Sequence, residues 1–183
     1  MTENNDTYLV QDCLTGKIEA FETLVERYQK TIYNVAYRMT NNYDDAEDIA
    51  QTVFIKVYDK LNTFNPKYKF FSWLYRIAMN ESMNYLNQRK RLTELDTEII
   101  IKEETPADEY NRQETSAQLE DALMQIEPEY RILIILKHLE GFSYQEIAYC
   151  LDLPEKKVKS RLFDARRLLK NVLITRGVFL YDR

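Results

Sequence analysis

The chain has 183 residues, with 25 Lys and Arg against 30 Asp and Glu, which gives a formal net charge of −5. This charge does not exclude nucleic acid as a partner, because the local electrostatic potential of a surface, and not the net charge, governs its encounter with DNA. Hydrophobic residues make up 45% and charged residues 30%, which excludes a disordered chain and indicates a soluble globular protein. The polar N-terminus lacks a signal-peptide pattern, and the longest aliphatic run, ILIIL at 132–136, is too short to span a bilayer. We therefore expect a cytoplasmic protein without membrane insertion.

Residues that break helices are scarce: the chain has three Gly and four Pro, and no alternating strand pattern is present, so an all-α fold is predicted. Apolar residues recur at helical spacing in three early segments, 17–39, 44–61 and 70–91. Asp44 and Glu47 fit a capping box at the start of the second segment. These segments predict a compact bundle of three or four helices over residues 1–92.

Acidic residues dominate the next segment, 93–115, which has little to bury and is predicted to be a linker. Four more helical segments follow it, at 116–126, 129–140, 143–151 and 155–170. We therefore expect two small helical domains, 1–92 and 116–183, joined by an acidic linker, each with its own interior.

The last helical segment concentrates positive charge, in Lys156, Lys157, Lys159, Arg161, Arg166, Arg167 and Lys170. Val158, Leu162 and Ala165 form one apolar stripe along it, so the other faces are free to be cationic. A helix with a capping box at Ser143 and Glu146 precedes it across a tight turn, which completes a helix-turn-helix. Such a unit places its second helix in the DNA major groove. The alternative, a solvated charged helix, is common for isolated charge runs but is less favoured in this context.

Two stretches of the sequence resemble known domains. EGFSYQEIAYCLDLPEKKVKSRLFDARRLLK closely resembles the promoter-reading domain of bacterial sigma factors, and YDDAEDIAQTVFIKVYDKL followed by FFSWLYRIAMNESMNYLNQRKR resembles their other conserved domain. Together, over about residues 16–92 and 116–173, they resemble the extracytoplasmic-function (ECF) group of the sigma-70 family. The resemblance implies a sigma factor that directs core RNA polymerase to specific promoters and assists promoter melting in transcription initiation.

The resemblance places a polymerase contact on the helix 44–61, which would dock on the clamp coiled coil of the largest subunits. The implied contact residues are Asp45, Asp48, Gln51, Phe54 and Lys56. Contact is favoured for Gln51 and Phe54. For the acidic residues at the helix start, capping and interaction with the helix dipole are an equally good explanation.

The segment 67–76 has basic residues among aromatic ones. Aromatic faces can stack on unpaired bases, while cations hold a single-stranded backbone. The resemblance assigns the melted minus-ten strand to this region, with the implied contacts Lys67, Tyr68, Lys69, Tyr75, Arg76, Asn80 and Asn84. Asn80 and Asn84 fall where the family reads a flipped base, and an amide suits a Watson–Crick edge. Trp73 is expected to be mainly a core residue.

For the minus-thirty-five duplex, the resemblance implies contacts from Arg131, Lys156, Lys157, Lys159, Ser160, Phe163, Asp164, Arg166 and Arg167. Two residues depart from the family pattern. Asp164 stands where a basic residue is common, and it can accept from a cytosine amino group or pair with Arg167. Asp152 replaces the usual turn Gly, but Asp tolerates left-handed geometry, so the turn is predicted to persist.

No enzyme is expected, because no catalytic constellation converges, His138 stands alone, and one His with two Cys argues against a metal site. We also expect no cofactor and no small-molecule substrate. An anti-sigma protein is a further candidate partner. The alternative function is a stand-alone helix-turn-helix regulator with an N-terminal sensor or dimerisation domain, for which the aromatic and basic segment 67–76 has no use.

Overall fold

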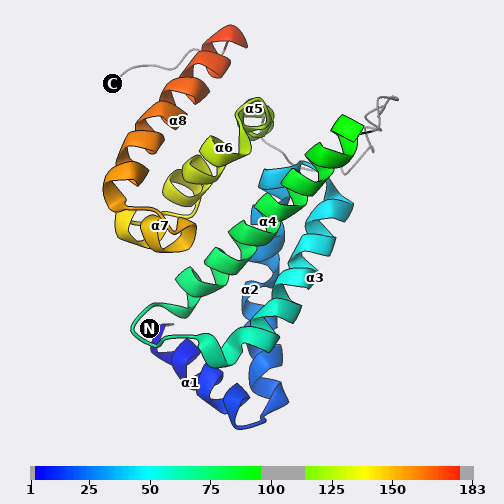
Figure 1. Ribbon diagram of the computed structural model, residues 1–183, viewed down its shortest axis with the longest axis vertical. Coiled ribbons are helices and arrows are strands. Elements are labelled where there is room, and N and C mark those ends of the chain that lie inside the picture. The colour runs from blue at the N-terminus through cyan, green and yellow to red at the C-terminus, as the bar shows by residue number, and fades with distance from the viewer. Residues whose placement is uncertain (1–2, 96–113, 178–183) are drawn as a thin grey trace.

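The computed structural model describes residues 3–95 and 114–177, and within them every regular element is helical (Figure 1). The all-α prediction is confirmed. Most of the predicted linker lies outside the described residues, as does the C-terminal tail from 178. No helix in the described ranges combines the length and apolarity needed to cross a bilayer.

The first domain contains the helices α1 (Glu3–Leu14), α2 (Ile18–Thr40), α3 (Tyr43–Lys60) and α4 (Phe70–Leu95), with a short 3₁₀ turn, η1 (Leu61–Thr63), after α3. The sequence did not predict α1. It is tied to α2 by the buried carboxylate of Asp6, which accepts hydrogen bonds from Arg27 and Tyr28.

At the junction between α2 and α3, the structure differs from the predicted N-terminal cap of α3. α2 ends at Asn41, which adopts the left-handed conformation with φ 53°. The side chain of Asn42 then accepts a hydrogen bond from the backbone N–H of Asp45 at 2.9 Å. The cap of α3 is therefore Asn42, and Asp44 with Glu47 do not form the predicted capping box.

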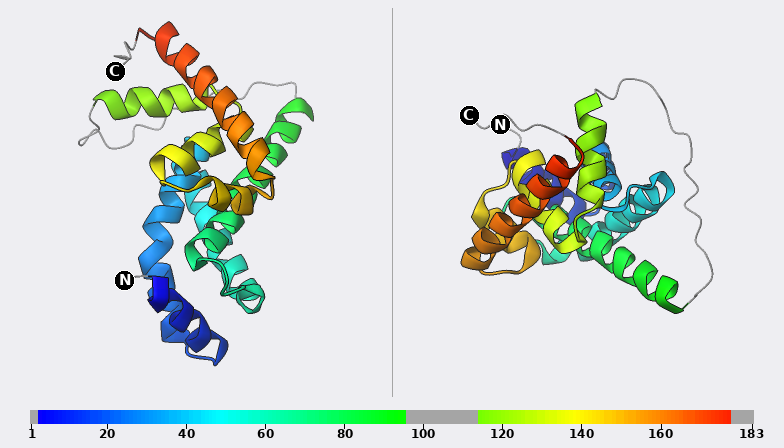
Figure 2. Two further views of the ribbon diagram at one scale, coloured as in Figure 1. Left: turned by 90° about the vertical axis from the view of Figure 1, so that its left-hand side faces the viewer. Right: turned by 90° about the horizontal axis from the view of Figure 1, so that it is seen from above.

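The second domain contains α5 (Glu114–Met124), α6 (Pro128–Ile134), a π-helical turn η2 (Ile135–Leu139), α7 (Tyr144–Leu151) and α8 (Glu155–Thr175). The capping box of Ser143 and Glu146 is present at the start of α7. Asp152 adopts φ 52° in the turn before α8, so both predictions for the helix-turn-helix are confirmed. In Figure 2, α8 runs along the outside of this domain, packed on α6 and α7.

α4 is the helix of the first domain that meets the second domain. It packs against α2 and α3 on one side and against α7 on another (Figure 1). Phe142 of the second domain packs its ring 5.3 Å from that of Phe71 and 5.0 Å from that of Tyr75. Most of the buried apolar residues of the two domains belong to one continuous cluster. The expectation of two separate interiors is therefore wrong for this conformation. Phe142, which follows η2, and the inner face of α7 pack against the apolar residues of α4.

Arg131 joins the domains through a buried guanidinium that is only 6% exposed. Its Nε donates to the carbonyl of Leu123 at 2.9 Å, its Nη2 donates to those of Met124 and Ile126, and its Nη1 donates to that of Met39 on α2. Burial lowers the pKa of Arg131 to about 10, so it stays charged at neutral pH. The predicted contact of Arg131 with the DNA backbone does not agree with this placement, because its N–H groups point into the protein.

Arg131→Met should lower the free energy of unfolding by at least about 2 kcal/mol, since it removes charged donors from carbonyls in a region closed to water. Arg161→Met is the matched control, because Arg161 pairs with Glu129 at 3.7 Å on the surface and such pairs contribute about 0–1 kcal/mol. Urea unfolding followed by circular dichroism measures both. Equal stabilities of the two variants would contradict the structural role of Arg131.

Candidate functional site

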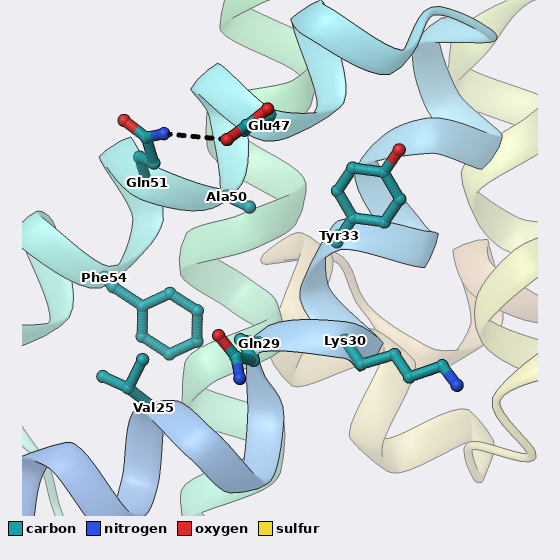
Figure 3. A pocket seen from close by; sticks show the side chains of 8 residues that line it. All are labelled: Val25, Gln29, Lys30, Tyr33, Glu47, Ala50, Gln51 and Phe54. Carbon is teal, nitrogen blue, oxygen red and sulfur yellow. Dashed lines mark hydrogen bonds between the residues drawn. The ribbon is translucent and has the colours of Figure 1, made fainter.

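A groove of about 600 Å³ opens between α2 and α3 (Figure 3). Its walls are Val25, Gln29, Lys30 and Tyr33 from α2, and Glu47, Ala50, Gln51 and Phe54 from α3. In Figure 3 the Phe54 ring lies above Val25. The Gln51 amide donates to Glu47 at 3.4 Å. The groove thus combines an apolar floor with amide and carboxylate groups along its edge.

The five predicted polymerase contacts lie on two different faces of α3. Gln51 and Phe54 face the groove. Asp45 faces α4, where it accepts from Tyr85 Oη at 2.5 Å and from Arg89 Nη1 at 2.6 Å.

Lys56 also faces α4, since its ammonium lies 2.6 Å from a carboxylate oxygen of Glu81. Asp48 lines a smaller cavity between α3 and α4 that also includes Asn84. The sequence analysis grouped these five predicted polymerase contacts as one site. The periodicity of the helix places them on two different faces of α3.

The predicted strand-binding residues fall into two groups. Lys67, Asn80 and Asn84 are exposed. The other four contact the second domain. Tyr75 is fully buried, and its hydroxyl donates to Glu140 at 2.6 Å, so burial and this hydrogen bond raise the pKa of Tyr75 well above its usual value.

The remaining three members of this group also contact the second domain. The Tyr68 ring stacks on the Tyr149 ring with centroids 4.2 Å apart. Lys69 pairs with Glu146 at 3.2 Å. Arg76 lies over the Tyr149 ring and pairs with Asp152 at 3.7 Å. Trp73 is buried against Phe64 and Phe70, as expected for a core residue.

α8 presents its polar faces to solvent. Val158, Leu162 and Ala165 are buried. The predicted duplex contacts that are exposed on this helix are Lys156, Lys157, Lys159, Ser160, Phe163, Arg166 and Arg167. Phe163 is 66% exposed. Asp164 pairs with Arg167 at 3.2 Å, which is one of the two roles that the sequence left open.

Neighbouring elements orient two of the cations on α8. Lys159 pairs with Glu155 at 2.6 Å, and its ammonium lies 5.3 Å from the centroid of the Tyr144 ring. Arg166 Nε donates to His138 Nε2 at 3.1 Å. These contacts hold long side chains along one surface, which lowers the entropy that they lose on binding a phosphate backbone.

Family comparisons match both domains. Residues 24–92 match the model of sigma-70 region 2, and residues 116–169 match that of sigma-70 region 4. The chain belongs to the sigma-70 family, in its ECF group. It is a sigma factor that acts with core RNA polymerase at promoters, and the match of the first domain to region 2 supports this function over that of a stand-alone regulator.

Curated relatives match this chain over most of their length. The chain is 33% identical to the RNA polymerase sigma-H factor of Pseudomonas aeruginosa, with 94% of this chain and 96% of that one covered. It is 34% identical to the ECF RNA polymerase sigma-E factor of Escherichia coli, covering 91% and 93%. Among solved structures, CnrH in complex with the cytosolic domain of CnrY has a TM-score of 0.70 at 26% identity, covering 93% and 98%.

Several residues at these surfaces were not found from the sequence. No role was assigned from the sequence to Glu140, Tyr149 or Arg38, because their partners lie 65 to 102 positions away along the chain. The aromatic residues of 67–76 indicated a surface on which unpaired bases could stack, and gave no sign of a protein partner.

The sigma factor has a single histidine, and the pKa of His138 is lowered by burial, by Arg166 and by Lys137. Arg166→Ala should raise this pKa towards 6.5, because it removes a neighbouring positive charge. NMR titration of the imidazole signals measures the shift. Arg167→Ala is the control and should leave the pKa unchanged. No shift in Arg166→Ala would contradict the contact on α8.

Proposed function

We propose that the two domains of this sigma factor divide promoter binding between them. Residues 1–92 bind the clamp coiled coil of core RNA polymerase and hold the melted minus-ten strand. Residues 116–183 bind the minus-thirty-five duplex. The acidic segment 93–115 joins them and follows a basic channel of the polymerase, where its charge is complementary.

The groove between α2 and α3 is the feature that carries the polymerase assignment. A helix of a coiled coil presents apolar side chains flanked by polar ones, and the groove offers Val25 and Phe54 between Gln29 and Gln51. We assign contact to Gln51 and Phe54. Asp45 and Lys56 act indirectly, because they fix α4 to α3, and Asp48 is exposed beside that junction.

The duplex assignment rests on α8. Its exposed cations can neutralise phosphates, and Ser160 with Phe163 can reach base edges from the same surface. Arg131 is left out of this set because it is buried. Asp164 stays in it, since its pair with Arg167 is half-exposed and can open when the helix meets a base.

The strand assignment rests on α4 and the loop before it. Asn80 and Asn84 are exposed on α4, and Lys67 is exposed on the loop. In this proposal Tyr68, Lys69, Tyr75 and Arg76 join them once the second domain moves away, because aromatic rings and cations together suit a single strand.

The proposal assigns no catalytic chemistry to this chain, and it places the protein in the cytoplasm, where its polymerase acts. We also propose that an anti-sigma protein binds it. The relative CnrH was solved with the cytosolic domain of another protein, CnrY, bound.

The whole assignment is tested by mixing the purified chain with core RNA polymerase and genomic DNA and sequencing the run-off transcripts. Transcripts that start at a shared promoter motif are expected. Failure of the chain to associate with the polymerase would refute the proposal.

Phe54→Ala combined with Gln51→Ala should weaken binding to core polymerase by at least about 30-fold, since losing a buried anchor of an interface commonly costs about 2 kcal/mol. Ile55→Ala is the matched control: Ile55 is the next residue on α3 and is not part of the groove wall. Fluorescence anisotropy with labelled sigma factor measures both. Equal losses in the two variants would place the contact elsewhere.

Lys159→Glu with Arg167→Glu should reduce promoter binding by at least about tenfold and leave polymerase binding unchanged, because two cations that face phosphates become anions. The control, Lys17→Glu with Lys60→Glu, makes the same charge change on the first domain. Mobility shift of a promoter fragment with holoenzyme reports the effect. Loss of both activities would show misfolding or a wrong assignment of α8.

A further inference from the structure

Asp164 places a negative charge in the middle of the cationic helix α8. Val158, Leu162 and Ala165 are buried and define the inner face of this helix. By the helical period, Asp164 lies on the opposite face, and α8 runs along the outside of the second domain (Figure 2). The Asp164 side chain is 36% exposed. A carboxylate at this position needs an explanation, because it repels the phosphates that the cations around it attract.

The surroundings of Asp164 leave its carboxylate accessible to a further donor. Asp164 Oδ1 accepts from Arg167 Nη2 at 3.2 Å, and a carboxylate has about four acceptor positions, so this pair uses only part of its capacity. Helix side chains lean towards the N-terminus, which places the carboxylate over the turn that carries Ser160. Ser160 is small and exposed, so the edge of a base can approach the carboxylate there.

Arg167 gives the carboxylate a preferred direction. The Arg167 side chain is 66% exposed, and exposed ion pairs contribute little to folding stability, so the pair matters for orientation and not for the fold. A guanidinium has five N–H donors, and those that do not bind Asp164 remain available for a phosphate. The free protein therefore presents an oriented carboxylate at the centre of its proposed duplex-binding surface.

Only two of the four bases offer a carboxylate a donor in the major groove. Guanine presents the acceptors N7 and O6, and thymine presents the acceptor O4 beside a methyl group, so neither can donate to an anion. Adenine has the N6 amino group, but its acceptor N7 lies next to that group and repels the carboxylate. Cytosine has the N4 amino group without a neighbouring acceptor on the same base. Cytosine is therefore the best partner for an aspartate.

We propose that Asp164 determines specificity at one base pair of the upstream duplex, by accepting a hydrogen bond from the N4 amino group of cytosine. The assignment rests on the proposed binding of this duplex by α8. Cations on α8 bind the phosphates of any sequence and supply affinity. The carboxylate lowers affinity for every duplex that has no amino group at this position, so Asp164 acts by rejection of wrong sequences as much as by attraction to the right one.

The experiment uses holoenzyme made from the full chain and core RNA polymerase. Its DNA is a promoter recovered by the run-off experiment, with the base pairs upstream of the melted region randomised, and the bound fraction is sequenced. Asp164→Ala and Asp164→Asn are compared with the control Glu155→Gln. Glu155 lies on the same helix and pairs with Lys159 at 2.6 Å, so this substitution changes the net charge equally, beside another proposed contact. Circular dichroism checks that every variant remains helical.

The parent chain should favour cytosine over guanine and thymine by at least about fivefold at one position. Asp164→Ala should reduce this preference to less than about twofold, because the acceptor is lost. Asp164→Asn should transfer the preference to adenine, because an amide can pair with N6 and N7 together. Both variants should bind the guanine-substituted promoter at least about threefold more tightly than the parent chain does. Glu155→Gln should retain the preference for cytosine.

Two results would overturn the role of Asp164. The first is a parent chain that favours cytosine at no position of the upstream duplex. The second is a preference for cytosine that persists unchanged at every position in both Asp164→Ala and Asp164→Asn.

The double substitution Lys159→Glu with Arg167→Glu separates failure of this inference from failure of the proposed function. If it weakens promoter binding while both Asp164 variants leave all base preferences unchanged, α8 binds the duplex and Asp164 does not read it. If it leaves promoter binding unchanged, the duplex assignment of α8 is wrong, and the role of Asp164 is wrong with it.

Discussion

The structure depends on α4 being covered on two sides at once. α2 and α3 cover one side of this helix, and α7 with the residues after η2 covers another. A long helix rich in aromatic residues is costly to leave in water, because each large ring buries substantial apolar area when it is covered. The same rings are suited to stacking on bases. The surface that would serve nucleic acid is thus also the surface that the free protein has most reason to cover.

Polar contacts determine how that cover is placed. Apolar burial is non-directional, and Phe142 against Phe71 would tolerate several orientations. Glu140 requires Arg38 and Tyr75 in a fixed geometry, and the buried Arg131 guanidinium requires the Met39 carbonyl at the end of α2. Losing such buried partners is expensive, so they select one arrangement of the two domains.

The distribution of charge explains how an acidic protein can bind DNA. The formal net charge of −5 is an average over separate surfaces. The outside of α8 is cationic, while the inner side of the second domain is anionic and meets Lys69 and Arg76. α3 shows the same separation at smaller scale, since one face forms the groove wall and the other holds α4 through Asp45 and Lys56. Each element therefore serves two surfaces, and helical periodicity keeps them apart.

The sequence by itself determined every described helix except α1, and also the helix-turn-helix and the family, because spacing and turn geometry are local properties. The Ser143 cap and the left-handed Asp152 followed from a few neighbouring residues. Tertiary structure decided which residues of a helix act together. It placed Gln51 and Phe54 on one face of α3 and Asp45 on another, buried Arg131, and joined Tyr75 to Glu140. Tyr75 and Glu140 are 65 positions apart, and Arg38, which pairs with the same carboxylate, is 102 positions from it. The energy of these pairs depends on the removal of water between surfaces, which no local pattern records.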